Sequence, residues 1–263
     1  GFDPEFPVDL NAIRNNLLFK NVNNDLHFKF ADAGLSPTHW QASTFPEEFR
    51  SKISVVHDGI DTLDLAPDEG VKLSLEDGRV FTKADKIITF VNRHIEPYRG
   101  CHTFFRALPD VLSKHLDAHV FIIGEEGVSY GAKPQGAKSW KQIFWDDEVS
   151  PKLNAQQRGR VHFLGRVDYG SFKRILALSS AHVYLTYPFV LSWSLLEAMS
   201  IGCPIVASDT PPVAEVIHDQ ENGYLFDFFS PVALSDAVNR LLDDEASRVA
   251  LSHAGRRFVQ KNF

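Results

Sequence analysis

From residue 79 onward, short segments that are apolar on both faces alternate with helical segments, and this alternation restricts the fold more than any other feature. The run KIITFVNR at 86–93 is rich in β-branched residues and predicts a buried strand. Similar runs are AHVFIIGE (118–125), RVHFLGR (160–166), AHVYLTYP (181–188) and PIVASDT (204–210). Strands buried on both faces and separated by helices are typical of a parallel sheet covered on both sides. The pattern predicts a doubly wound, Rossmann-like α/β domain over residues 79–263.

The segments between these strands have apolar residues at helical spacing. Residues 99–115 and 169–180 are expected to be helices, and residues 192–202 form a further predicted helix that ends at Gly202. Pro109 predicts a kink or an early break in the first of these helices, because proline removes a backbone donor and crowds the preceding turn. One or two amphipathic helices are expected over residues 231–260.

The first 78 residues are organised differently. They contain helical segments and one strand, KISVV at 52–56, and the Asp-Gly pair in LEDGRV (75–80) is typical of a tight hairpin. One strand with two helices cannot close a sheet, so we predict the tail of a second, incomplete α/β domain over residues 1–78. The chain begins at Gly1 and its only methionine is Met199. We therefore expect a fragment of a longer protein whose first few residues are cloning remnants.

The composition argues against several classes of protein. Hydrophobic residues make up 44% of the 263 residues and charged residues 23%, as in ordinary globular proteins. The net charge of −7 gives no general attraction to nucleic acid, so we expect no nucleic-acid partner. No apolar run approaches the roughly 20 residues that a membrane-spanning helix needs, and we expect no signal peptide. We expect a cytoplasmic protein, with peripheral attachment to a membrane as the alternative.

The cysteines and histidines do not indicate a metal site. Cys101 and Cys203 lie far apart inside apolar segments, which favours buried free thiols in a reducing cytosol. The 11 histidines form no cluster with zinc-ligand spacing. His119, His162 and His182 lie within predicted strands and are expected to be core or edge residues. We expect neither a metal nor a cofactor.

Several turns are predicted to meet at one edge of the sheet. Doubly wound sheets bind ligands at the carboxyl ends of their strands, where the strand order reverses. A helix that opens at Ser192 would direct free N–H groups and the positive end of its dipole to this edge, and phosphate is the natural ligand of such a site. Ser192 and Ser194 could either cap the helix or bind an oxyanion.

Three charged residues near the same edge are candidates for binding a nucleotide. Arg93 ends the first strand and Arg99 opens the next helix, so the two guanidinium groups could clamp a diphosphate. The alternative is a pair of solvated arginines, one of them balanced by Glu96. Glu197 is the single acid of an otherwise apolar helix. It could accept hydrogen bonds from the vicinal hydroxyls of a ribose, or it could stabilise the first helical turn.

Two common nucleotide-binding motifs are absent from the sequence. No G-x-G-x-x-G follows the first strand, which weighs against a nicotinamide dehydrogenase. There is also no G-x-x-x-x-G-K-[ST] phosphate loop, which weighs against a phosphate-loop protein.

Four motifs occur in an order that resembles a known family. They are VNR…EPYRG, FLGRV, YPFVLSWSLLEAMSIGCPIVASDTPPVAEVI and ENGYLF. Together they are similar to the nucleotide-sugar-binding domain of family-four glycosyltransferases, which have the GT-B fold. SPTHWQASTFPEEFRSKISVVHDGIDT resembles the segment that closes the amino-terminal domain of the same enzymes. The resemblance implies transfer of a sugar from a nucleoside diphosphate sugar to an acceptor hydroxyl, with retention of configuration and without a metal.

The resemblance also implies roles for individual residues. Glu197 would bind the donor ribose. Arg99 stands where the family usually has lysine. The diphosphate would be bound by Arg93, Arg99, Ser192 and Ser194, the base by the backbone of Gly165, Arg166 and Val167, and the donor sugar by Phe189, Val190, Leu191 and Trp193.

The chain departs from the family in two respects. Phe189 stands where the family has the first of two glutamates separated by seven residues, so the acid expected to hold the donor sugar is missing. The first half of the acceptor domain is also absent, together with the catalytic groups that the family places there. We expect the chain to bind its donor better than it catalyses transfer to a glycan, lipid-linked or protein acceptor.

Three alternatives remain open from the sequence. The first is a non-catalytic nucleotide-sugar-binding module, which Phe189 favours. The second is a Rossmann-type oxidoreductase, against which the missing glycine motif counts. The third is a sugar-phosphate epimerase or a phosphorylase that shares the fold.

Overall fold

A computed structural model describes residues 2–6 and 9–263 of the chain. The described residues form two compact units, with the boundary between Asp58 and Gly59. We had expected the boundary after residue 78. The structure places it earlier because Leu65, Val71 and Leu73 are buried in the core of the second unit. The hairpin assigned to the first segment therefore belongs to the second unit.

The first unit contains three helices and a small sheet among its described residues. Its elements are α1 (Leu10–Phe30), β1 (Gly34–Ser36), α2 (His39–Ser43), α3 (Glu47–Arg50) and β2 (Ile53–Val55). Strand β2 confirms the strand expected at 52–56, and it pairs in parallel with β1. The sequence did not predict β1, which has only three residues and one buried side chain, that of Ser36.

The second unit is built on a six-stranded sheet. Its strands are β5 (Ile87–His94), β6 (His119–Glu125), β7 (Val161–Gly165), β8 (Ala181–Tyr184), β9 (Ile205–Ser208) and β10 (Tyr224–Phe226). They lie in the order β10-β9-β8-β5-β6-β7, and every neighbouring pair is parallel. The chain starts at β5, moves outward to β7 and returns to β8 on the other side of β5. The strand order therefore reverses between β5 and β8, as the predicted doubly wound fold requires.

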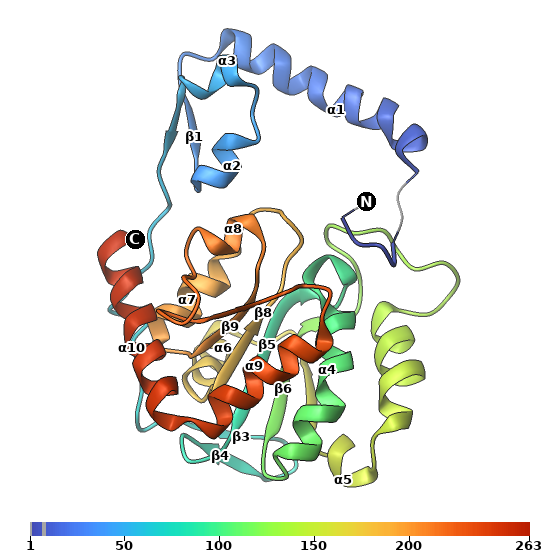
Figure 1. Cartoon of the computed structure of the whole chain (residues 1–263), viewed down its shortest axis with the longest axis vertical. Helices are drawn as coiled ribbons and strands as arrows, with labels where there is room; N and C mark the ends of the chain where they lie inside the picture. Colours follow the sequence, from blue (N-terminus) through green and yellow to red (C-terminus); the bar gives the residue numbers. More distant parts are fainter. Residues whose placement is uncertain (1, 7–8) are drawn as a thin grey trace. The chain divides into compact units, whose positions relative to one another are not determined.

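Helices cover both faces of this sheet. They are α4 (Cys101–Lys114), α5 (Ala155–Arg158), α6 (Tyr169–Ala177), α7 (Trp193–Ile201), α8 (Pro211–Ala214), α9 (Pro231–Asp243) and α10 (Glu245–Asn262), with shorter turns η1 (Pro97–Arg99), η2 (Gln142–Val149) and η3 (Ser150–Lys152). Figure 1 shows α4 and α9 in front of the sheet and α6 and α7 behind it. The break expected at Pro109 does not occur, because α4 is buried along most of its length and packs against the sheet. Phe104 of α4 stacks on Phe90 of β5 at a centroid distance of 4.2 Å.

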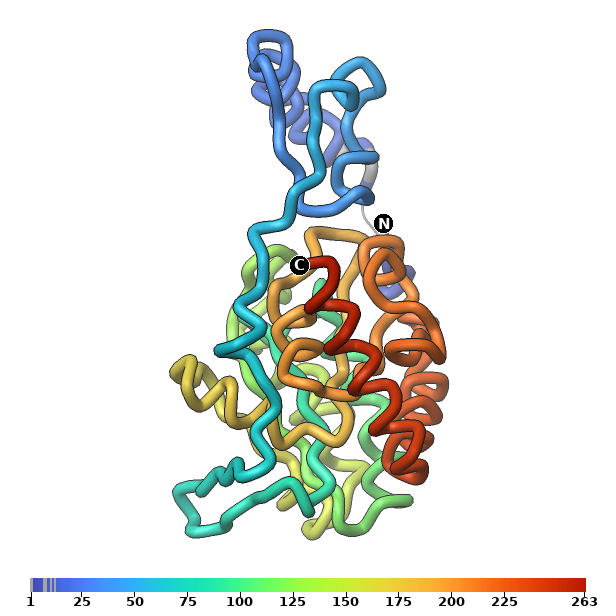
Figure 2. Tube along the Cα trace, turned by 90° about the vertical axis from the view of Figure 1, so that its left-hand side faces the viewer, coloured from blue at the N-terminus to red at the C-terminus, as the bar shows by residue number. Residues whose placement is uncertain are grey.

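The segment that opens the second unit runs along its outside to a hairpin, as Figure 2 shows. Strands β3 (Lys72–Ser74) and β4 (Val80–Thr82) form the antiparallel hairpin that the Asp-Gly pair predicted. Gly78 has φ +85°, which glycine adopts without strain. Before the hairpin, Arg256 of α10 donates to the carbonyl oxygens of Thr62 and Leu65 at 3.1 and 3.0 Å. These bonds attach the segment to α10.

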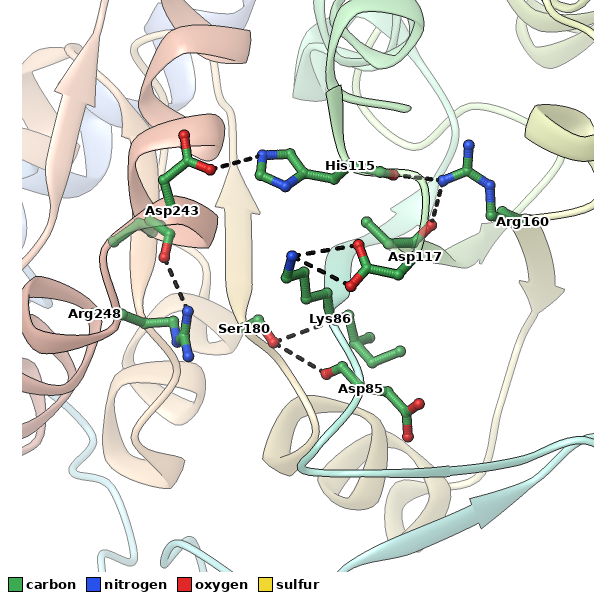
Figure 3. A network of polar contacts seen from close by, with 11 residues as sticks. Asp85, Lys86, His115, Asp117, Arg160, Ser180, Asp243 and Arg248 are labelled. Atoms are coloured by element: carbon green, nitrogen blue, oxygen red, sulfur yellow. Dashed lines mark hydrogen bonds and ion pairs between the residues drawn. The ribbon is translucent and has the colours of Figure 1, made fainter. Parts of the chain in front are cut away.

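Polar contacts close the amino edge of the sheet (Figure 3). Lys86, just before β5, lies 3.2 Å from the Asp117 carboxylate. Arg160, just before β7, donates to the carbonyl oxygens of Leu112, His115 and Ala118 at 2.7, 2.7 and 3.0 Å. Each of these cations is matched by acceptors from the chain itself.

Both cysteines are free and buried, as the sequence predicted. Burial raises the pKa of the Cys101 thiol well above its ordinary value and that of Cys203 to about 12. His119, His162 and His182 lie in strands β6, β7 and β8, as expected. Within the described residues, no helix combines the length and the apolar character needed to cross a membrane.

Candidate functional site

A cavity of about 1010 Å³ lies at the carboxyl edge of the sheet, where the strand order reverses. The ends of β5 and β6, the turn after β7, and the first turns of α6 and α7 contribute its lining. These elements are distant in the sequence. The parallel sheet brings them together because all its strands end at the same edge.

Most of the predicted site residues line this cavity. Those that do are Arg93, Arg99, Arg166, Val167, Ser192, Trp193, Ser194 and Glu197. Gly165, Phe189, Val190 and Leu191 are not part of the lining. The predicted diphosphate and ribose groups therefore share one cavity, whereas the predicted sugar groups do so only through Trp193.

Arg99 is buried and held from two sides. Its Nη1 donates to the hydroxyl oxygens of Thr186 at 2.7 Å and Tyr184 at 3.2 Å. Its guanidinium carbon lies 5.3 Å from the centre of the Tyr130 ring, within cation–π range. No carboxylate in the described part of the chain pairs with it. The arrangement leaves a buried positive charge beside the cavity without a counterion.

Gly100 allows Arg99 to approach the sheet this closely. Its φ is +68°, and a Cβ at this position would lie 2.5 Å from the Cβ of Leu185. Any other residue would therefore have to push the start of α4 away from β8. The glycine fixes the distance between Arg99 and the hydroxyls of Tyr184 and Thr186.

Arg93 and Glu96 do not form the ion pair considered from the sequence. Arg93 is exposed at the cavity and has no hydrogen-bond partner in the described part of the chain. Glu96 is fully buried and accepts hydrogen bonds from the backbone N–H groups of Ser129, Tyr130 and Gly131, the shortest at 2.9 Å. Glu96 therefore fixes the loop after β6 against the cavity, and Arg93 keeps its full capacity to donate.

The amino end of α7 opens into the cavity. Ser192 is the N-cap, and its hydroxyl accepts weakly from the N–H of Ser194 at 3.4 Å. The backbone N–H of Ser192 donates to the hydroxyl of Tyr184 at 2.9 Å, the same hydroxyl that accepts from Arg99. Tyr184 thus joins the buried arginine to the positive end of the helix. Gly202, with φ +87°, ends α7 as predicted.

Glu197 faces the cavity from α7 and is half-buried. Burial raises the pKa of its carboxyl above the ordinary value, and a hydrogen bond from Tyr169 opposes this rise. The Tyr169 hydroxyl donates to Glu197 Oε1 at 2.9 Å. Burial and this bond raise the pKa of Tyr169 to about 12, so tyrosine is the donor.

The residues predicted to contact base and sugar divide into two groups. Arg166 and Val167 lie in the turn after β7 and line the cavity, and Gly165 precedes them with φ +62°. Phe189 instead packs into an aromatic cluster, with its ring 4.9 Å from that of Tyr130 and 5.2 Å from that of Tyr98. The position that resembles an acidic one in the family is thus filled by an apolar packing contact.

Sequence analysis missed three residues that line the cavity, Tyr130, Tyr169 and Tyr184, and it considered Glu96 only as a counterion of an arginine. Tyr169 stands directly after the GRVD turn at the carboxyl end of a predicted strand, so its position alone could have identified it. Nothing local distinguishes Glu96, because its three partners lie more than thirty residues away in the sequence. In the part of the chain that the structure describes, no group of three or more His, Cys, Asp or Glu side chains could hold a metal ion.

The chain matches two models of known protein families. The model of glycosyl transferases group 1 matches residues 75–258, and that of the glycosyl transferase family 4 group matches residues 1–65. Spore coat protein SA of Bacillus subtilis is 29% identical over 233 residues, which is 84% of this chain and 57% of that protein. The phosphatidyl-myo-inositol mannosyltransferase of Mycobacterium leprae is 29% identical over 69% of this chain and 44% of its own length. The chain spans about half the length of these curated relatives.

Two solved structures with similar folds illustrate the likeness. Anabaena Alr3699/HepE, crystallised with UDP and glucose, superposes with a TM-score of 0.70 at 17% identity, covering 100% of this chain and 65% of that one. The carboxyl-terminal domain of the group 1 glycosyl transferase LpcC from Francisella tularensis superposes with a TM-score of 0.61 at 22% identity, covering 77% of this chain and 97% of that one. Both are similarities of fold.

Proposed function

Because the chain belongs to the glycosyl transferases group 1 family and has the GT-B type of fold, we propose that it binds a nucleoside diphosphate sugar in the cavity at the β5–β8 reversal. The proposed reaction is transfer of the sugar to an acceptor hydroxyl with retention of configuration. The acceptor is a growing glycan, a lipid-linked sugar or a protein glycan.

One observation carries the proposal. Arg99 is a buried cation that pairs with no carboxylate of residues 2–6 or 9–263, and it lines the cavity together with the amino end of α7 and the exposed Arg93. A buried charge is costly unless it is paired. A diphosphate would supply the missing negative charge, and its oxygens match the donors of guanidinium groups and of a helix amino end.

The same cations support a role in the chemical step. The departing nucleoside diphosphate gains negative charge as the bond to the sugar breaks, and fixed donors that already face that position lower the barrier. Arg99 is held in place before the ligand arrives, by Tyr184, Thr186 and the Tyr130 ring. Glu197, on the next turn of α7, is proposed to accept hydrogen bonds from the donor ribose.

The family match and one structural neighbour support this choice of donor. The Anabaena neighbour was crystallised with UDP and glucose, and one curated relative is a mannosyltransferase. Neither the nucleotide nor the sugar of this chain follows from them. The oxidoreductase alternative has no support among the matched families.

A thermal-shift screen against UDP, GDP, ADP and their common sugar conjugates tests the proposal. A ligand that binds only the folded chain raises its melting temperature, by the equivalent of about 2.7 kcal/mol at a hundredfold excess over the dissociation constant. We expect one nucleoside diphosphate to give a selective shift that Arg93→Ala reduces. A flat response to all of them, in both this chain and a longer form, would refute the donor site.

Phe189 favours a second candidate, a nucleotide-sugar-binding module without transferase activity. Its ring is packed against Tyr98 and Tyr130, so it offers no acceptor to sugar hydroxyls. Product analysis of the longer protein with nucleotide sugar and acceptors separates the candidates. Binding without turnover would support the module. Release of an isomer or a sugar phosphate from the nucleotide sugar alone would indicate an epimerase or a phosphorylase.

A further inference from the structure

Tyr169 is the first residue of α6, and neighbours on the same helix hold its ring. The ring stacks on that of Phe172 at a centroid distance of 5.6 Å and an interplanar angle of 22°. The Lys173 ammonium lies 5.5 Å from the ring centre and is itself held by Asp64, 2.7 Å away. Residues three and four positions apart are neighbours on a helix surface, so these contacts follow from the sequence of α6. They fix the position of the tyrosine hydroxyl independently of α7.

The Glu197 carboxylate, by contrast, has few constraints of its own. The hydroxyl of Tyr169 is its one hydrogen-bond partner in the described part of the chain, at 2.9 Å from Oε1, and no cation there pairs with it. The last torsion of a glutamate side chain is broad, so an unbonded carboxylate rotates. The bond from Tyr169 therefore selects one orientation of this carboxylate in the cavity.

We infer that Tyr169 is a positioning residue for the donor ribose. By holding Oε1, it turns the Glu197 carboxylate so that Oε2 and the second lone pair of Oε1 accept hydrogen bonds from the two vicinal ribose hydroxyls. A carboxylate oxygen accepts two hydrogen bonds, so the tyrosine and a hydroxyl share Oε1 without competing. The inference rests on the proposed function, in which Glu197 binds the ribose of a nucleoside diphosphate.

The test compares ribonucleoside diphosphates with their 2′,3′-dideoxy analogues, which lack both hydroxyls. The affinities of the chain for UDP, GDP and ADP are measured by titration calorimetry. For the nucleotide that binds, the measurement is then repeated with its 2′,3′-dideoxy analogue. Tyr169→Phe keeps the stacked ring and removes only the hydroxyl. We expect it to weaken binding of the ribonucleotide about tenfold, in the range of a hydrogen bond to a charged group, and to leave the dideoxy form unchanged. In a Glu197→Ala background, Tyr169→Phe should have no further effect.

The matched control is Tyr224→Phe, which removes a hydroxyl from β10 at the opposite edge of the sheet from β7. It should leave both affinities unchanged. If Tyr169→Phe weakens both nucleotide forms alike, or weakens neither, the positioning role is wrong while the nucleotide site stands. If none of the three ribonucleotides binds the unaltered chain, the proposed function fails and this inference fails with it. Melting temperatures of all variants check that each is folded.

Discussion

Charged side chains have different kinds of partner at the two ends of the strands of the six-stranded sheet, its amino edge and its carboxyl edge. At the amino edge, Arg160 donates to three carbonyl oxygens, and Lys86 lies 3.2 Å from Asp117 (Figure 3). At the carboxyl edge, among the residues that the structure describes, Arg99 has hydroxyl partners and ring contacts but no carboxylate, and Glu197 has the hydroxyl of Tyr169 as its one hydrogen-bond partner. We call the amino edge closed because groups of the chain match its charges, and the carboxyl edge open because no described group of opposite charge pairs with Arg99 or Glu197.

This difference shows that the unpaired charges lie beside the cavity. Taking an ion out of water costs several kcal/mol unless partners replace the water. At the amino edge, carbonyls and carboxylates of the chain are those partners, so its charges contribute to stability. At the carboxyl edge, the partners of Arg99 and Glu197 are neutral hydroxyls, and the full complement must come from a ligand. Burial raises the pKa of Glu197, which lines the cavity, and a perturbed carboxyl in a cavity is typical of functional sites.

The largest expected effect concerns Arg160. Arg160→Met leaves the carbonyls of Leu112, His115 and Ala118 without this donor, and we expect the free energy of unfolding to fall by about 3 kcal/mol. Nucleotide binding should remain unchanged, because Arg160 is on the opposite edge from the cavity. Urea denaturation measures the first effect and calorimetry the second. If Arg160→Met is as stable as the unaltered chain, the contacts of Arg160 do not stabilise the amino edge and this interpretation is wrong.

Arg99→Met should give the converse result. We expect binding of the nucleoside diphosphate to weaken about 50-fold, or about 2.3 kcal/mol, because a charge-assisted contact to phosphate is lost. The free energy of unfolding should change little, because the variant also removes a buried cation for which the described residues supply no counterion. Arg99→Lys keeps the positive charge but lacks the forked N–H donors of a guanidinium group. Its affinity for the nucleoside diphosphate should lie between that of the unaltered chain and that of Arg99→Met. A variant that binds normally would remove Arg99 from the site.

Glu197 gives a smaller effect with a defined pH dependence. Burial raises the pKa of this carboxyl above its ordinary 4.5, so the folded chain binds this proton more tightly than the unfolded chain. The contribution of Glu197 to stability therefore falls as pH rises through the raised pKa, whereas its hydrogen bonds to a ligand require the ionised form and appear over the same range. Glu197→Gln should weaken nucleotide binding about tenfold at neutral pH and flatten its dependence on pH. A pH profile of binding that stays the same in this variant would show that another group titrates.

The smallest effect concerns the histidine pair near the amino edge. His119 Nδ1 lies 3.0 Å from His162 Nε2, and burial lowers the pKa of His162 from 6.5 to about 4, with Arg79 and His119 adding to this. The unfolded chain therefore binds more protons between pH 6.5 and 4, so stability is full above this window and is lost as pH falls through it. Because His162 is partly exposed, we expect about 1 kcal/mol from it. The free energy of unfolding, measured by denaturation at pH 7 and pH 4.5, should differ less between the two pH values for His162→Asn than for the unaltered chain. An equal difference would mean that other groups cause the loss of stability in acid.

Short-range patterns predicted most of the fold. The β-branched runs identified the strands of the parallel sheet, Gly202 marked the end of α7, and the Asp-Gly pair at 77–78 marked the hairpin. Glu197 was also identifiable, because a single acid in an apolar helix at the carboxyl edge is unusual. Each of these features depends on a few consecutive residues and on the local preferences of the backbone.

What the sequence by itself determined is therefore the order of elements, the edge of the sheet at which the cavity lies, and the family to which these motifs belong. Tertiary structure decided what depends on distant partners. Helix α4 continues past Pro109, because the burial of this helix outweighs the loss of one hydrogen bond. Leu65 and Val71 belong to the second unit, because they are buried in its core. Tertiary structure also turned Glu96 away from the arginines and brought the hydroxyl of Tyr169 to Glu197, 28 residues farther along the chain. The energy of a buried polar group depends on which partners the fold brings to it, and no local pattern encodes that choice.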